Sequence, residues 1–104
     1  MIIYVSAPYS KGDVGGNIRR ACYAGDMLLL KGHIPVIPHL SHLWHLISPH
    51  SWETWMEISL ALLTVCDAVL RLDGESNGAD LEIAQAKEDC MVIYFSLEEV
   101  PDVS

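Results

Sequence analysis

The chain has 104 residues, which is enough for one domain and too few for two. About half of the residues are apolar, so a hydrophobic core can form, yet no apolar run reaches the roughly 20 residues that span a bilayer. The formal net charge is −8, and the sequence contains no basic stripe. This composition argues against membranes and nucleic-acid polymers as partners, because a polyanion needs such a stripe.

The N-terminal segment "MIIYVSAPYS" is apolar but has no basic leader and no small-residue cleavage site. We therefore interpret it as a first strand and not as a signal peptide. The three cysteines, Cys22, Cys66 and Cys90, are widely spaced, and each lies in an apolar stretch. This pattern predicts buried free thiols in a reducing compartment, and we expect a cytoplasmic protein.

Predicted strands and helices alternate along the chain. Residues 2–6 form a continuous apolar run, which is typical of a strand buried on both faces. A glycine-rich loop at 11–17 leads into a helix whose apolar residues recur at helical spacing and which ends at Gly32. Residues 33–38 predict a short strand, and their two prolines favour the edge of a sheet.

The second half of the chain continues this alternation. Residues 39–50 predict an irregular segment, residues 51–66 a helix and residues 67–72 a strand. A loop over residues 74–78, a helix over 79–89 and a strand over 90–95 follow. Ser51 is the predicted N-cap of the first of these helices. The polar tail from residue 96 onward is expected to fray.

Alternating strands and helices predict one α/β domain over residues 1–104, with a parallel sheet and right-handed crossovers. Ligands bind such sheets beyond the carboxyl ends of the strands, at the point where the strand order reverses. The three loops at that end are 6–17, 38–50 and 73–78, and the unusual residues of the chain lie in them. The sequence therefore predicts a binding site formed by these loops.

The stretch "GESNGADLEIAQA" combines a loop with a helix start. Ser76 can donate a hydrogen bond, Gly78 allows close approach of a ligand, and the free N–H groups of the new helix can hold an anion. The positive helix end favours the ionised form of Glu82, as a nucleophile requires. An ordinary acidic residue that complements the helix dipole would give the same pattern.

Two segments resemble the nucleoside 2-deoxyribosyltransferase superfamily. "IYVSAPYS" resembles its first strand and loop, and residues 66–95 resemble its third strand, loop, helix and fourth strand. The shared positions are Asp67, Gly78, Glu82 and Ala86. The resemblance implies a flavodoxin-like three-layer fold with a small, mostly parallel sheet of about four strands, and it implies that Glu82 is the catalytic nucleophile.

Spacing narrows the resemblance to one branch. Ser76, Gly78 and Glu82 follow the pattern S-x-G-x-x-x-E, which is similar to the deoxynucleoside 5'-monophosphate N-glycosidases, where the serine and glycine hold the phosphate. We therefore expect cleavage or transfer at the N-glycosidic bond of a nucleotide or nucleoside, with no cofactor and no metal. The loop after the first strand contacts sugar and base in this family, which implies binding roles for Ser6, Ala7 and Tyr9.

The chain departs from the family at Ser59, where the resemblance places an aspartate that assists at the reaction centre. A serine hydroxyl is not a general acid near neutral pH. This departure leaves three readings open: a slow hydrolase, an altered way of handling the base, or a non-catalytic nucleotide-binding module.

Other residues add further candidates. His39, His42 and His45 recur every three residues, so they predict a metal site, a pocket rim with His39 near the base, or packing histidines. Residues 11–17 do not match a dinucleotide or P-loop pattern, although Arg19 or Arg20 could neutralise a phosphate. A homodimer or larger homo-oligomer is expected from an apolar surface on and beside the second helix, comprising Trp44, Trp52, Trp55, Met56, Leu60 and Leu63.

Overall fold

Four short strands form one sheet in which all neighbours are parallel, in the order β2-β1-β3-β4. The computed structural model describes residues 1–103, and the strands are β1 (Ile2–Ser6), β2 (Ile34–Val36), β3 (Ala68–Arg71) and β4 (Val92–Tyr94). The predicted α/β class and the edge position of β2 are confirmed. Because β1 lies between β2 and β3, the strand order reverses beside β1, and the loops after β1 and β3 meet at this switch point.

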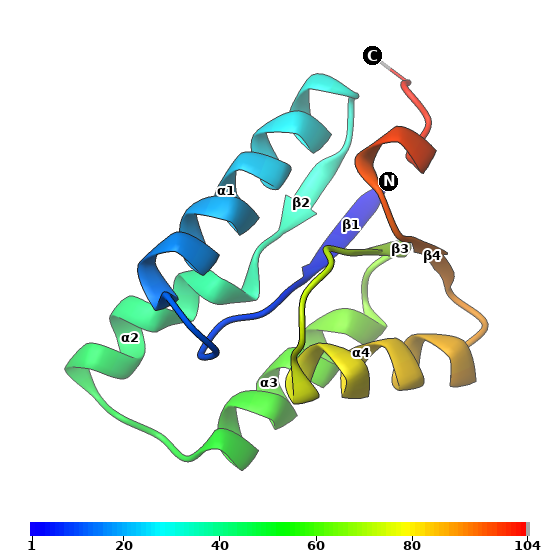
Figure 1. Cartoon of the computed structure of the whole chain (residues 1–104). Helices are drawn as coiled ribbons and strands as arrows, with labels where there is room; N and C mark the ends of the chain where they lie inside the picture. Colours follow the sequence, from blue (N-terminus) through cyan, green and yellow to red (C-terminus); the bar gives the residue numbers. More distant parts are fainter. Residues whose placement is uncertain (104) are drawn as a thin grey trace.

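Helices cover both faces of the sheet, which gives the three predicted layers (Figure 1). Helix α1 (Val14–Leu30) packs on one face, and helices α3 (Trp52–Thr64) and α4 (Asn77–Glu88) pack on the other. A 3-10 turn, η1 (Pro38–Ser41), and a short helix, α2 (His42–Ile47), connect β2 to α3. No helix within residues 1–103 is both long enough and apolar enough to cross a membrane.

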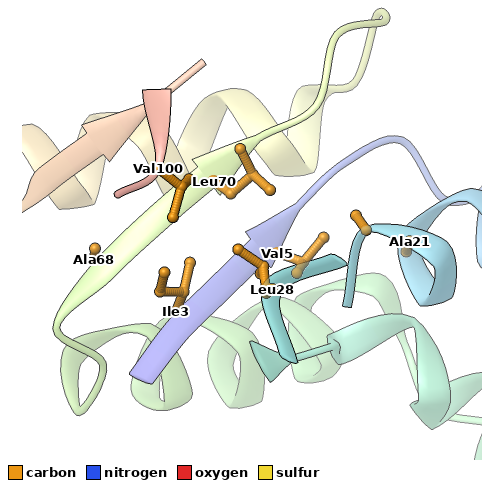
Figure 2. Close-up of a cluster of buried hydrophobic side chains, with 8 residues drawn as sticks. Ile3, Val5, Ala21, Leu28, Ala68, Leu70 and Val100 are labelled. Atoms are coloured by element: carbon orange, nitrogen blue, oxygen red, sulfur yellow. The ribbon is translucent and has the colours of Figure 1, made fainter. Parts of the chain in front are cut away.

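Successive side chains of β1 point alternately to the two faces of the sheet, so this strand contributes to two hydrophobic cores. Ile3 and Val5 point to the α1 side, whereas Tyr4 points to the α3 and α4 side. Figure 2 shows the first core, in which β1 and β3 meet α1 and the C-terminal segment. Because neighbouring residues of a strand face opposite ways, Tyr4 and Ser6 share the face that packs against α4.

Within the C-terminal tail, residues 96–103 do not fray as predicted, and residue 104 lies outside the described residues. The tail forms a second 3-10 turn, η2 (Leu97–Glu99), after which Val100 is fully buried in the α1-side core. The ring of buried His33 donates from Nε2 to the carbonyl of Pro101 at 2.7 Å, and the amide of Val103 donates to Lys31 at 2.8 Å. The single helix α1 leaves part of this face uncovered, and the tail fills that space.

The prediction of three buried thiols is confirmed for Cys66 alone. Cys22 is half-buried on α1, and Cys90 is exposed in the turn between α4 and β4. The backbone of Cys90 has a φ of 55°, in the left-handed region that a tight turn after a helix often needs. The apolar stretch "CMVIYF" therefore begins with a turn residue and not with the buried part of the strand.

Close contact between two loops completes the switch point. Gly74, in the loop after β3, has a φ of 118°, and a Cβ at this position would lie 2.8 Å from Cγ of Pro8 in the loop after β1. Only glycine allows both this conformation and this approach. At the opposite end of the strands, Asp67 accepts a hydrogen bond of 2.7 Å from the amide of Ile2, which fixes β1 beside β3.

The exposed apolar surface differs from the predicted one. Leu63 is fully buried in the core, and Leu60 packs against it, so neither is available to a partner. Of the predicted residues, Trp44 and Trp52 are exposed, and the neighbouring residues Leu43, Leu46 and Ile47 of α2 add to this exposed apolar group, which we call the α2 surface. A patch of this kind commonly marks an interface. We propose that two copies of the chain pair through this α2 surface.

The α2 surface predicts a homodimer at micromolar concentration. Replacing Leu46, which is 64% exposed, by Glu places a charge in the proposed interface and should weaken dimerisation at least about tenfold, or ~1.4 kcal/mol. Leu30→Glu changes a similarly exposed leucine at the end of α1 and should leave assembly unchanged. Light scattering measures both effects, and a wild-type mass near 11.5 kDa would contradict the proposal.

Candidate active site

A pocket of about 460 Å³ opens at the switch point, between the loop after β1, the turn η1, α3 and the start of α4. Its volume lies within the range of small-molecule sites. Seven of the eight predicted site residues line it: Ala7, Tyr9, His39, Ser59, Ser76, Gly78 and Glu82. The eighth, Ser6, is fully buried behind the wall, where its side chain contacts Glu82.

Glu82 is more deeply placed than the sequence predicted. Ser76 is the N-cap of α4, so Glu82 lies in the second turn of the helix and not at its start. Glu82 is only 6% exposed. The reason is helical periodicity: Ala79, Glu82, Ile83 and Ala86 share the buried face of α4, so Glu82 points between the helix and the sheet.

Two hydroxyl groups on β1 hold the buried carboxylate. The phenol of Tyr4 donates a hydrogen bond to Oε2 of Glu82, and the hydroxyl of Ser6 donates to Oε1 at 2.8 Å. Each carboxylate oxygen therefore has its own donor, which fixes the side chain in one orientation. Tyr4 is fully buried, and burial together with the charge of Glu82 raises its pKa far above the usual value, so it remains a protonated donor.

Opposing effects act on the ionisation of Glu82. Burial raises the pKa of this carboxyl, whereas the hydrogen bonds from Tyr4 and Ser6 and the charge of Arg71 lower it. Burial is the largest effect, and the pKa lies above its ordinary value of 4.5. The carboxyl is therefore harder to ionise than an ordinary glutamate, because burial outweighs the two hydrogen bonds and the charge of Arg71.

Arg71, at the end of β3, was missed by sequence reasoning. Its side chain is 11% exposed, and its guanidinium donates to the carbonyl of Leu72 and, at 2.8 Å, to that of Gly74. It also approaches the carboxylate of Asp80 at 3.4 Å. Arg71 thus fastens the loop that leads into α4 and contributes positive charge near Glu82. The available signal was an arginine at the end of an otherwise apolar strand.

Tyr4 was also missed, although a buried tyrosine needs a partner for its hydroxyl. The sequence "IIYVS" contains this signal, since Tyr4 and Ser6 are the two hydroxyl-bearing residues of one strand face. Ser59 belongs to the same group: it lines the pocket, and its hydroxyl hydrogen-bonds with Tyr4 and partly offsets the rise of the phenol pKa.

The start of α4 forms one end of the pocket. Ser76 accepts a hydrogen bond of 3.1 Å from the amide of Ala79, which leaves the proton of its hydroxyl available to a ligand. A Cβ on Gly78 would lie 3.2 Å from Sδ of Met56, so a side chain here would crowd the pocket wall. Lys11 also lines the pocket, and its ammonium pairs with Glu75 at 2.7 Å, directly before Ser76.

Arg19 and Arg20 do not take part in this pocket. They line a separate surface hollow beside Tyr23 and Met27, and Arg20 is bound to Asp73. The suggestion that one of them neutralises a phosphate at the start of α1 stays a prediction.

The histidines do not converge. His39 is buried in η1 and donates from Nε2 to the carbonyl of Pro8 at 3.0 Å, while burial lowers the pKa of its ring. Nδ1 of His42 is hydrogen-bonded to the hydroxyl of Tyr9, and Nδ1 of His45 accepts from the indole of Trp55 at 2.7 Å. No group of three potential metal ligands exists among residues 1–103. The three histidines therefore do not form the predicted metal-ligand cluster.

Comparison with known proteins gives a family but no activity. Residues 1–96 match the model of DUF7768, a domain of unknown function. The chain belongs to this family. No curated protein matches the DUF7768 chain.

Among solved structures, the DUF7768 chain is similar to a 2-deoxyribosyltransferase from the psychrotolerant bacterium Bacillus psychrosaccharolyticus, which is described as a biocatalyst for the synthesis of antiviral and antitumoral nucleosides. The TM-score is 0.71 at 16% sequence identity, over 89% of this chain and 69% of the other. The resemblance inferred from sequence is therefore confirmed at the level of the fold.

The raised pKa of Glu82 predicts a pH-dependent stability. A carboxyl whose folded pKa is raised stabilises the fold fully below its unfolded pKa, and this contribution is lost as the pH rises through the folded pKa. Glu82→Gln cannot ionise, so it should melt at a higher temperature than the wild type at neutral pH, and the gap should close under acidic conditions. Thermal melts across this pH range measure it.

Glu88→Gln is the matched control, because Glu88 is an exposed glutamate on the same helix. This variant should follow the wild type at every pH. A wild type that gains stability over Glu82→Gln as the pH rises would contradict the sign derived above.

Proposed function

We propose that this DUF7768 domain cleaves, or transfers at, the N-glycosidic bond of a nucleotide, with Glu82 as the nucleophile. One observation carries the proposal: a buried carboxylate, with both oxygens held by hydroxyl donors, lines a pocket of about 460 Å³ at the switch point of the sheet. The shared fold with a 2-deoxyribosyltransferase that is described as a biocatalyst for nucleoside synthesis supports this proposal.

The reaction begins with attack of a Glu82 oxygen on the anomeric carbon of the sugar, through an oxocarbenium-like transition state. Tyr4 and Ser6 position the attacking oxygens, and both can donate again to the carboxylate when the glycosyl-enzyme breaks down and the negative charge returns to Glu82. Burial leaves the carboxylate poorly solvated, so less water must be removed before attack. Water or a second base then resolves the covalent intermediate.

The start of α4 is the proposed phosphate site. The first N–H groups of a helix have no partner within the helix and favour an anion. The Ser76 hydroxyl can add a donor, and Lys11 adds the one positive side chain among the described residues that line the pocket. The S-x-G-x-x-x-E spacing, similar to that of the deoxynucleoside 5'-monophosphate N-glycosidases, supports a phosphorylated substrate.

A non-catalytic nucleotide-binding module is the second candidate. The observation that favours it is Ser59, which contributes a hydroxyl to the pocket wall where the enzyme resemblance places a carboxyl group. Such a module would bind nucleotides through the same α4 site without releasing base.

Glu82→Gln should lower the rate of base release at least about 1,000-fold, as expected when a nucleophile is removed, while nucleotide binding persists. In the wild type, kcat/KM should rise with pH through the raised pKa of Glu82, because only the carboxylate attacks. Chromatography of free base over a panel of nucleotides measures both. Glu88→Gln should keep wild-type rates, and a wild type that binds nucleotides in thermal-shift assays but releases no base would favour the binding module.

Ser76→Ala should weaken nucleoside monophosphates selectively, by about 1.5–3 kcal/mol for one hydrogen bond to a charged group. The same change removes the α4 N-cap and should cost ~1 kcal/mol of stability. Ser51→Ala separates the two effects, because it removes the N-cap of α3 without altering a pocket residue. Calorimetric titration with a monophosphate and its nucleoside gives the comparison, and equal losses for both ligands would remove Ser76 from the phosphate site.

A further inference from the structure

Breaking an N-glycosidic bond requires a fate for the electron pair that moves onto the base. A neutral base departs as an anion unless an acid protonates it, and a positioned acid contributes about 100- to 10,000-fold to such a step. An acid for this step would have to be a titratable group that lines the pocket. Among residues 1–103, the titratable side chains that line it are Tyr9, Lys11, His39 and Glu82.

None of these groups is suited to protonate a departing base. Glu82 is committed to the sugar carbon. The one ring proton of neutral His39 is donated to the carbonyl of Pro8, its Nδ1 has no partner, and burial lowers its pKa, so the ring offers an acceptor and not an acid. Lys11 is paired with Glu75 beside the proposed phosphate site.

The hydroxyl groups are equally unsuited. Tyr9 is engaged with Nδ1 of His42, and burial raises its pKa, which makes it a weaker acid than an ordinary tyrosine. Ser59 is a hydroxyl in contact with the Tyr4 phenol, within the group that holds Glu82. The titratable and hydroxyl-bearing side chains that line this pocket therefore support the attack on the sugar, and none of them supplies an acid for the departing base.

The pocket does offer features that favour a positively charged ring. Trp52 and Trp55 line it together with Tyr9, and aromatic faces, tryptophan best of all, attract cations. The carboxylate of Glu82 lies in the same pocket, and the whole chain carries a formal charge of −8. A cationic heterocycle would meet a favourable potential here, whereas a neutral one would not.

We infer that the substrate of this site is a nucleotide whose base is already a cation at the glycosidic nitrogen or within its ring system, such as a pyridinium or an N-alkylated purine. This inference rests on the proposed function. Glu82 forms a bond to C1′ as the C1′–N bond breaks, and the electron pair of that bond cancels the positive charge, so the base leaves neutral without a proton. Water then attacks C1′, the electrons of the ester C–O bond return to Glu82, and the water proton passes to solvent.

Matched substrate pairs test the inference. N7-methylguanosine 5'-monophosphate and guanosine 5'-monophosphate differ by one methyl group and one charge, and nicotinamide mononucleotide provides a pyridinium. The purine pair is used in its ribose and 2-deoxyribose forms, and release in the presence of Glu82→Gln is subtracted as background. We expect kcat/KM for the cationic member to exceed that for the neutral member at least about 100-fold.

The outcomes separate this inference from the proposed function. Comparable or faster cleavage of the neutral member would overturn the inference and leave Glu82 as a nucleophile. Absence of Glu82-dependent base release from every nucleotide would overturn both.

A second variant examines the missing acid directly. Ser59→Asp places a carboxyl group in the pocket wall and should raise cleavage of the neutral member at least about tenfold, thereby narrowing the ratio within each pair. Ser59→Asn has nearly the same shape without an acidic proton and should leave the ratio as in the wild type. An unchanged ratio in a folded Ser59→Asp protein would mean that lack of an acid does not select the substrate. If Ser59→Asp does not fold, the ratio of kcat/KM for the cationic and the neutral substrate in the wild type decides whether the inference holds.

Discussion

The hydrogen bonds from Tyr4 and Ser6 to Glu82 are the interaction on which the candidate site depends. They connect β1, at the centre of the sheet, with the second turn of α4. Because both donors lie on one face of one strand, the carboxylate is oriented by rigid structure and not by a loop. The hydroxyl of Ser59 extends the same group to α3, so three elements of one face of the sheet converge on a single carboxylate.

This arrangement balances stability against reactivity. Burial of Glu82 disfavours its charged form, whereas the hydrogen bonds from Tyr4 and Ser6 and the charge of Arg71 favour it and offset part of this effect. A carboxylate in full contact with water would need no such support, but it would be a weaker nucleophile. Arg71 contributes twice, since its guanidinium also binds the carbonyls of the loop that precedes α4. The end of β3 thereby fixes the helix that carries Glu82.

The segment from η1 to the start of α3 forms the other wall of the pocket. Trp44 and Trp55 pack edge to face at 4.9 Å between ring centres, and His45 and His50 pack against Trp55. This cluster attaches α2 to α3 on its inner side, while Leu43, Leu46 and Ile47 remain exposed on its outer side. The proposed dimer surface on α2 therefore lies between η1 and α3 in the chain, the two elements that line this side of the pocket.

The sequence by itself determined the order of the elements, the parallel sheet, the edge position of β2 and the end of the sheet where the pocket lies. These features follow from periodicity, from proline and from the fixed handedness of crossovers, all of which are local or topological. It also identified Ser51 as an N-cap and seven of the residues that line the pocket.

Only the tertiary structure decided the depth of Glu82, its bonds to Tyr4 and Ser6, the place of Arg71, the separate partners of the histidines and the burial of Val100. The Tyr4 and Ser6 bonds join residues 78 and 76 positions apart. A pattern within one segment cannot specify such contacts, because they depend on how α4 rotates as its small apolar residues pack against the sheet. The same rotation decides whether a helix glutamate faces water or a buried pair of hydroxyl groups.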